Sequence, residues 1–167
     1  MPEDRPTEPR AVSPSMDRWS DRPERVARQG LFRGRGDVLA VIALGGALGS
    51  TARYAVALLL PHAPNRIPWS TVTANLTGAF LLGVLMVFVN DVWPPNRYVR
   101  PLLGVGVLGG YTTFSTYMLD AHALAAAGEL GPLGGYVLVT LVGGLLAVWL
   151  GAAFGRLLTR PRGKETT

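Results

Sequence analysis

The sequence contains no cysteine, only two histidines, and very little charge over its long middle part. Without cysteine, neither a disulfide nor a thiolate metal site can form. His62 and His122 lie far apart and have no metal-ligating neighbour, so a histidine metal site is not expected. The net charge is +5, but the bulk of the chain has no basic patch, which argues against nucleic-acid binding.

The charged residues gather toward the two ends of the chain. Of the 16 basic and 11 acidic residues, fifteen precede Val38 and five follow Gly155. Residues 1–36 are poor in apolar side chains and cannot bury enough surface to offset the entropy lost on ordering, so we expect a disordered polar tail. The pattern is not that of a cleaved signal peptide, because the apolar run begins only near Val38 and is longer than the hydrophobic region of a signal peptide. Residues 158–167 form a short basic tail.

Between the tails lie four apolar runs, at about residues 38–60, 69–89, 102–127 and 133–154. Each has about the 20 residues that a helix needs to cross a bilayer core. Main-chain polar groups in lipid must bond within their own segment, which favours helices. The sequence therefore predicts an all-α membrane protein with a four-helix transmembrane domain at residues 37–157. Three glycine pairs favour close helix contacts: Gly45 and Gly49, Gly106 and Gly110, and Gly151 and Gly155.

The third apolar run contains an unusual stretch, GVGVLGGYTTFSTYMLD at residues 104–120. Its first six residues match the dinucleotide-binding pattern GxGxxG, but no strand–helix–strand unit surrounds them, so we reject that function. Glycines weaken a helix and the hydroxyl residues can bond freed main-chain groups, which predicts a break near Gly109–Thr112. Freed carbonyls at such a break can bind a cation, and half-helix N-termini favour an anion. Phe114 and Tyr117 share a face, where they either pack or present ring edges to an anion.

A few polar side chains lie inside the other runs, where each marks a site or an interhelical bond by default. Arg53 lies deep in the first run and either serves a site, ties helix ends together or reaches the membrane surface. Thr71 and Asn75 are four residues apart and share a helical face. Asn75 either bonds to another helix or donates to an anion. The last run repeats this spacing with Tyr136 and Thr140, although Tyr136 also fits an interfacial aromatic.

Three motifs in these runs make the sequence resemble the CrcB/Fluc family of fluoride channels. They are GGALGSTARY in the first run, TVTANLTGAFLLG in the second and GVLGGYTTFSTYMLD in the third, and the resemblance extends over about residues 38–155. It implies a small four-helix membrane protein, not an enzyme, that acts as an antiparallel dimer in the cell membrane. The implied function is passive and selective export of fluoride, which lowers its concentration in the cytoplasm.

The resemblance also implies roles for individual residues. Main-chain carbonyls of Gly109 and Thr112 would hold a structural sodium ion that is not transported. Asn75 would donate to fluoride, and the other pore residues would be Phe114, Tyr117, Thr71, Tyr136 and Thr140. Arg53 would lie at the vestibule or support the dimer core, and Asp120 would be a polar neighbour of the pore. Tyr117 departs from the phenylalanine that the family pattern has, and Gly144 stands where a hydroxyl residue is common.

The basic residues predict how the chain inserts into the membrane. One face receives Arg33 and Arg35, the loop with Arg97 and Arg100, and the basic C-terminal tail, whereas the opposite face has only Arg66. Both termini should therefore be cytoplasmic. An antiparallel homodimer needs a chain that inserts both ways. The one-sided charge instead favours fixed insertion and pairing with an inverted homologous subunit.

Two other functions stay open on the sequence. The first is a small four-helix proton-coupled exporter of drugs or cations, which would need an intramembrane carboxylate, and Asp120 is the candidate. The second is a structural membrane subunit that transports nothing. No ATP-binding motif points to a pump.

Overall fold

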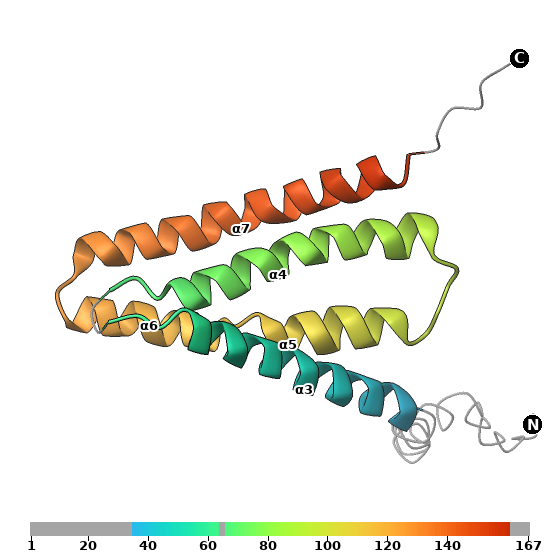
Figure 1. Cartoon of the computed structure of the whole chain (residues 1–167), viewed down its shortest axis with the longest axis horizontal. Helices are drawn as coiled ribbons and strands as arrows, with labels where there is room; N and C mark the ends of the chain where they lie inside the picture. The colour runs from blue at the N-terminus through green and yellow to red at the C-terminus, as the bar shows by residue number, and fades with distance from the viewer. Residues whose placement is uncertain (1–34, 64–65, 161–167) are drawn as a thin grey trace, which may run out of the picture. The chain divides into compact units, whose positions relative to one another are not determined.

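The computed structural model describes residues 35–63 and 66–160 (Figure 1). The chain divides into a unit that ends at Gly36 and a second unit that begins at Asp37, and the second is the one described below. Almost all of the tail predicted at residues 1–36 lies outside the described residues, as does most of the tail predicted at 158–167. Within the described ranges every regular element is a helix and there is no strand.

Three stretches are long and apolar enough to cross a membrane. They are α3 (Gly36–Leu59), α4 (Trp69–Val87) with its π-helical continuation η1 (Phe88–Val92), and α7 (Leu130–Leu158). Their mean hydropathies of 1.4, 2.1 and 2.3 suit a bilayer core. They match the predicted runs at 38–60, 69–89 and 133–154, and they make this a multi-pass membrane protein.

The predicted run at residues 102–127 is divided among several short elements. A π-helix, η2 (Arg100–Leu108), continues into α5 (Gly109–Tyr111), and α6 (Ser115–Ala126) follows. Thr112 has extended backbone, with φ −81° and ψ 158°, so the chain leaves helical geometry between Tyr111 and Ser115. Each helical segment is too short to cross a bilayer alone. Pro101, which has no amide hydrogen, and the glycines that follow it weaken regular α-helical bonding in η2.

Helices α4 and α7 run side by side through contacts between their backbones (Figure 1). A Cβ atom on Gly83 would lie 2.2 Å from the carbonyl oxygen of Val148, and one on Gly151 would lie 2.0 Å from that of Phe80. Gly155 faces Val87, whose Cβ would be 3.0 Å from an added Cβ. Glycine is thus required on both helices at this crossing, as small-residue packing in membranes predicts.

A second glycine contact joins α3 to η2 and α5. A Cβ on Gly45 would lie 2.5 Å from the carbonyl oxygen of Leu102, and one on Gly49 would lie 2.0 Å from that of Val107. A Cβ on Gly110 would lie 2.5 Å from the carbonyl oxygen of Gly46. The first two predicted glycine pairs therefore pack on each other, and α3 lies against the segment that leads to the end of α5.

A polar cluster ties the start of α3 to the loop before η2. Arg97 Nη2 donates to Asp37 Oδ2 at 2.6 Å, and the hydroxyl of Tyr98 donates to the same oxygen at 2.6 Å. The bond to the Asp37 carboxylate raises the pKa of Tyr98 above its ordinary value. Arg97 also lies over the Tyr98 ring, with its guanidinium carbon 4.9 Å from the centroid.

Candidate functional site

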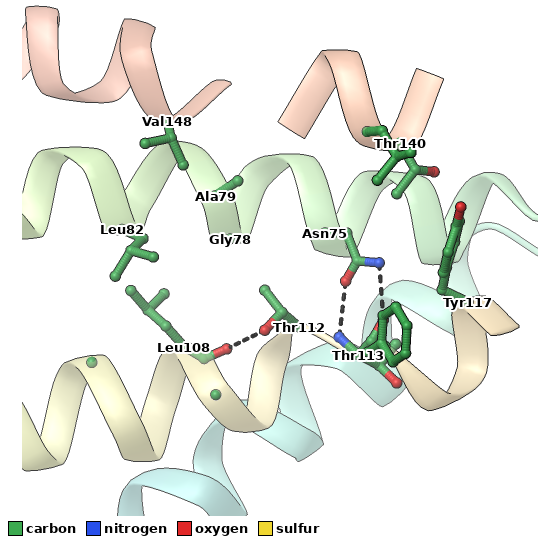
Figure 2. Close-up of a pocket in the computed structure, with 14 residues that line it drawn as sticks. Asn75, Gly78, Ala79, Leu82, Leu108, Thr112, Thr113, Tyr117, Thr140 and Val148 are labelled. Atoms are coloured by element: carbon green, nitrogen blue, oxygen red, sulfur yellow. Dashed lines mark hydrogen bonds between the residues drawn. The ribbon is translucent and has the colours of Figure 1, made fainter. Parts of the chain in front are cut away.

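The side chain of Asn75 in α4 forms two hydrogen bonds with the main chain of Thr113 (Figure 2). Asn75 Nδ2 donates to the Thr113 carbonyl at 3.0 Å, and the Thr113 amide donates to Asn75 Oδ1 at 2.8 Å. Thr113 lies in the non-helical segment, residues 112–114, which joins α5 to α6. The side chain of Asn75 therefore supplies the hydrogen bonds that a continuous helix would have provided. An amide nitrogen carries two hydrogens, which leaves one N–H of Asn75 for another acceptor.

Further bonds hold the rest of this segment and release two carbonyl groups. The amide and the hydroxyl of Thr112 both donate to the Leu108 carbonyl at 2.9 Å. The Thr116 amide donates to Thr113 Oγ1 at 3.1 Å. In an α-helix the amides of Thr113 and Thr116 would donate to the carbonyls of Gly109 and Thr112. Because both amides bond elsewhere, these two carbonyl oxygens lack the donors that an α-helix would provide.

Arg53 connects α3 to the same region. Its Nε donates to the Gly110 carbonyl at 3.2 Å, and Ser50 Oγ donates to that oxygen at 3.4 Å. Arg53 is half-buried. Arg53 thus forms a hydrogen bond between helices, which is one of the three roles that the sequence left open for it. Ser50 was not singled out from the sequence, because a serine in an apolar run gives no sign of a partner 60 positions away.

Asp120 in α6 accepts hydrogen bonds from two of the predicted site residues. Thr71 Oγ1 donates to Asp120 Oδ2 at 2.8 Å, and the hydroxyl of Tyr136 donates to the same oxygen at 3.2 Å. Tyr136 has no exposed surface, so its ring does not face a lipid–water interface. Three helices, α4, α6 and α7, thus meet at one carboxylate oxygen.

The two predicted aromatic residues touch but lie in different environments. The ring centroids of Phe114 and Tyr117 are 6.0 Å apart, and Tyr117 also packs on Tyr136 at 5.0 Å. Tyr117 is 7% exposed, whereas Phe114 is 74% exposed. Tyr117 therefore belongs to the small buried cluster of the unit, and Phe114 presents its ring at the surface.

A cavity of about 450 Å³ opens beside the non-helical segment (Figure 2). The predicted site residues that line it are Asn75, Gly109, Thr112, Phe114, Tyr117 and Thr140. The rest of its wall is largely apolar and includes Leu82, Leu108, Leu141 and Val148. Within the described residues, Thr140 Oγ1 is the buried side-chain polar atom that has no hydrogen-bond partner. The Thr140 side chain lines the cavity, and its hydroxyl has no acceptor among the described residues.

The predicted residues thus fall into two groups. One group lines the cavity, and the other, Thr71, Asp120 and Tyr136, forms the carboxylate cluster, with Tyr117 in contact with both. Arg53 belongs to neither group and bonds to the Gly110 carbonyl. The part of the chain that the structure describes has no group of three histidine, aspartate or glutamate side chains that could hold a metal ion. A cation at this site would accordingly depend on main-chain oxygens, which suits a hard ion.

Fold and site together define a helical multi-pass membrane protein in which a non-helical segment, held by side chains, borders a largely apolar cavity that contains a few uncharged polar side chains. A family model described as "CrcB-like protein, Camphor Resistance (CrcB)" matches residues 40–152. The chain belongs to the CrcB family, and the resemblance predicted from its three motifs is confirmed.

Curated relatives carry the name of an ion channel. The chain is 48% identical to "Fluoride-specific ion channel FluC 2" of Streptomyces avermitilis over 114 residues, which cover 68% of this chain and 72% of the relative. It is 40% identical to FluC 1 of Streptomyces coelicolor over 158 residues, covering 95% and 94% of the two chains. It is 44% identical to FluC of Xanthomonas axonopodis pv. citri over 118 residues, covering 70% and 89%. These names give no support to the drug or cation exporter.

Proposed function

We propose that this protein is a subunit of a fluoride-selective channel that lets fluoride leave the cell passively and so lowers cytoplasmic fluoride. The observation that carries this proposal is the cavity, where an N–H of Asn75 and the hydroxyl of Thr140 have no protein acceptor and the Phe114 ring lies beside them. The family membership and the names of the relatives support the same function.

Neutral donors suit the passage of fluoride. Fluoride is small and strongly hydrated, so close donors must replace its water, and a fixed positive charge would trap it. The amide of Asn75, the hydroxyl of Thr140 and the positively polarised edge of the Phe114 ring offer such contacts without a charge. Thr71 and Tyr136 each have one hydroxyl hydrogen, which Asp120 accepts. They serve fluoride as donors only when they turn away from Asp120.

In this proposal the segments on either side of the non-helical residues form the third of four membrane spans. The segments Arg100–Tyr111 and Ser115–Ala126 together have the length that one crossing requires. Non-helical backbone at membrane depth is tolerated where protein covers it or where it lines a cavity. The bonds from Asn75 and the adjoining cavity meet both conditions.

A structural sodium ion fits the two carbonyls that lack helical donors, those of Gly109 and Thr112. Gly110 is excluded as a ligand in this arrangement, because its carbonyl already accepts bonds from Arg53 and Ser50. When bound, the ion would hold the non-helical segment in place rather than cross the membrane. Two carbonyls from one chain leave a sodium shell incomplete, and an antiparallel partner chain would complete it.

The partner in this proposal is an inverted homologous subunit rather than a second copy. Four arginines of the described residues, Arg97, Arg100, Arg156 and Arg160, lie on the face that we assign to the cytoplasm, against Arg66 on the other. Such a bias fixes insertion with both termini in the cytoplasm. Reporters fused to the C-terminus in cells without a homologue test this point, because equal populations on both sides would contradict fixed insertion.

Fluoride efflux from proteoliposomes, followed with a fluoride electrode, tests the function. The protein is reconstituted alone and together with an inverted homologue, and chloride efflux is measured in parallel. The proposal requires fluoride flux well above that of chloride in at least one of the two preparations. Fluoride flux no greater than that of empty vesicles in both would refute it.

A further inference from the structure

The C-terminal end of α7 carries a groove that transport of fluoride does not explain. The groove has a volume of about 650 Å³ and six lining residues, Leu150, Ala153, Phe154, Arg156, Leu157 and Arg160. Arg156 lies in the last turn of α7, and Arg160 follows shortly after the helix, which ends at Leu158. Leu150 is 51% exposed and Leu157 is 61% exposed, so the apolar part of the groove is open on this chain.

The groove carries positive charge that no described carboxylate neutralises. Among residues 35–63 and 66–160 the only ion pair is that between Arg97 and Asp37, so it involves neither Arg156 nor Arg160. Helix α7 packs on α4 through Gly151 and Gly155, and Phe154 at the edge of the groove packs on Phe80 of α4, whereas Arg156 and Arg160 are exposed. The end of a membrane-crossing helix therefore presents two arginines next to the apolar part of the groove.

We infer that this groove binds an anionic phospholipid from the surrounding leaflet, with the headgroup phosphate on Arg156 and Arg160. The guanidinium fork matches a phosphate geometrically, and basic residues at helix ends attract anionic headgroups. An acyl chain of the same molecule would lie along Leu150, Phe154 and Leu157, and these contacts favour a lipid because a soluble phosphate cannot make them. The inference does not depend on what the channel conducts.

Quenching of Trp149 by brominated lipids tests the inference directly. Trp149 is 61% exposed and lies on the same face as Ala153 and Arg156, four and seven residues later. A variant that keeps Trp149 and has phenylalanine at Trp19, Trp69 and Trp93 makes it the one fluorescent tryptophan. The variant is reconstituted in vesicles that contain both phosphatidylcholine and phosphatidylglycerol. In one preparation the phosphatidylglycerol is brominated, and in the other the phosphatidylcholine is brominated.

We expect brominated phosphatidylglycerol to quench Trp149 more strongly than brominated phosphatidylcholine at equal content. Each arginine should account for roughly a fivefold preference. The double variant Arg156→Gln, Arg160→Gln should lose the preference, whereas the charge-matched double variant Arg66→Gln, Arg100→Gln should keep it. Quenching that is equal for both lipids in the parent, or that keeps its preference in the groove variant, would overturn the inference.

Inorganic phosphate separates a lipid site from general charge attraction. If the preference persists in added phosphate as it does in sodium chloride of the same ionic strength, the lipid assignment stands. If phosphate weakens the preference more than chloride does, the arginines recognise the phosphate group of the lipid. If both salts abolish the preference equally, it is general charge attraction and the lipid site is refuted.

Discussion

Asn75 and Thr113, 38 residues apart, pair through both the acceptor and a donor of the Asn75 amide. The pairing gives the amide and the carbonyl of Thr113 the hydrogen bonds that a helix would have given them. It also aims the Asn75 side chain along the cavity and leaves one N–H uncommitted. One residue therefore both fixes the segment and, in our proposal, meets the anion.

Replacing Asn75 with alanine should remove the two hydrogen bonds that hold Thr113 and, in our proposal, a hydrogen-bond donor to fluoride. Each main-chain group left unpaired at Thr113 costs about 1–3 kcal/mol, so the free energy of unfolding should fall. Fluoride efflux should fall as well. Asn75→Asp provides a sharper variant, because it keeps an acceptor for the Thr113 amide and loses the donor, so flux should be lost with less destabilisation. Wild-type fluoride flux in both variants would contradict the role of Asn75.

Thr140→Val should separate transport from stability. The hydroxyl of Thr140 is buried without a protein partner, so its removal should leave the free energy of unfolding unchanged or raise it by about 1 kcal/mol. Fluoride efflux should nevertheless fall, because a donor to the anion is lost. The control is Thr51→Val, which removes a hydroxyl that bonds to the Ala47 carbonyl on the exposed side of α3. Equal flux in the two variants would show that Thr140 only packs.

Gly151→Ala should disrupt the contact between α4 and α7. The added Cβ would lie 2.0 Å from the Phe80 carbonyl oxygen, and a forced shift of this kind costs about 1–3 kcal/mol. Gly144→Ala on the same helix is the matched control, because nothing lies within 4 Å of the added atom. Alanine there should be neutral or stabilising by about 0.5–1 kcal/mol through helix propensity. Thermal unfolding in detergent measures both, and equal melting temperatures would refute this packing.

Sodium should stabilise the assembled channel if the carbonyls of Gly109 and Thr112 hold it. A ligand that binds only the folded state at about 100 times its dissociation constant adds about 2.7 kcal/mol. Thermal unfolding should therefore shift upward in sodium relative to N-methylglucamine at the same ionic strength. The preparation must contain whichever partner supports flux. An unchanged unfolding temperature over a wide range of sodium concentrations would remove the metal from the proposal.

The apolar runs were enough to predict three long helices and their approximate ends, because a bilayer imposes one length and one composition on a crossing segment. The π-helical bonding of Arg100–Leu108 was not predicted, because Pro101 and the glycines weaken α-helical bonding without specifying which hydrogen-bond pattern replaces it. Local spacing predicted that Phe114 and Tyr117 would be neighbours. Their very different exposure follows from what α4 and α7 cover, which no local pattern encodes.

Hydrogen bonds between different helices could not be predicted from the sequence either. Sequence reasoning identified Thr71, Asp120 and Tyr136 separately, by resemblance and by their cost in lipid. Their meeting at a single carboxylate oxygen requires three helices to be placed correctly relative to one another. The same holds for Tyr111, whose hydroxyl lies 2.9 Å from Thr77 Oγ1 and was not assigned a partner.

The wide exposure of the Phe114 ring ties activity to how crowded the chains are in the bilayer. In our proposal the Phe114 ring borders the conduction route, and because the ring is 74% exposed, a partner chain would have to cover it to enclose that route. Transport per chain should then follow mass action, falling when protomers are diluted in lipid and recovering when they are concentrated. A cell that makes little of this protein would gain less than proportional relief from fluoride.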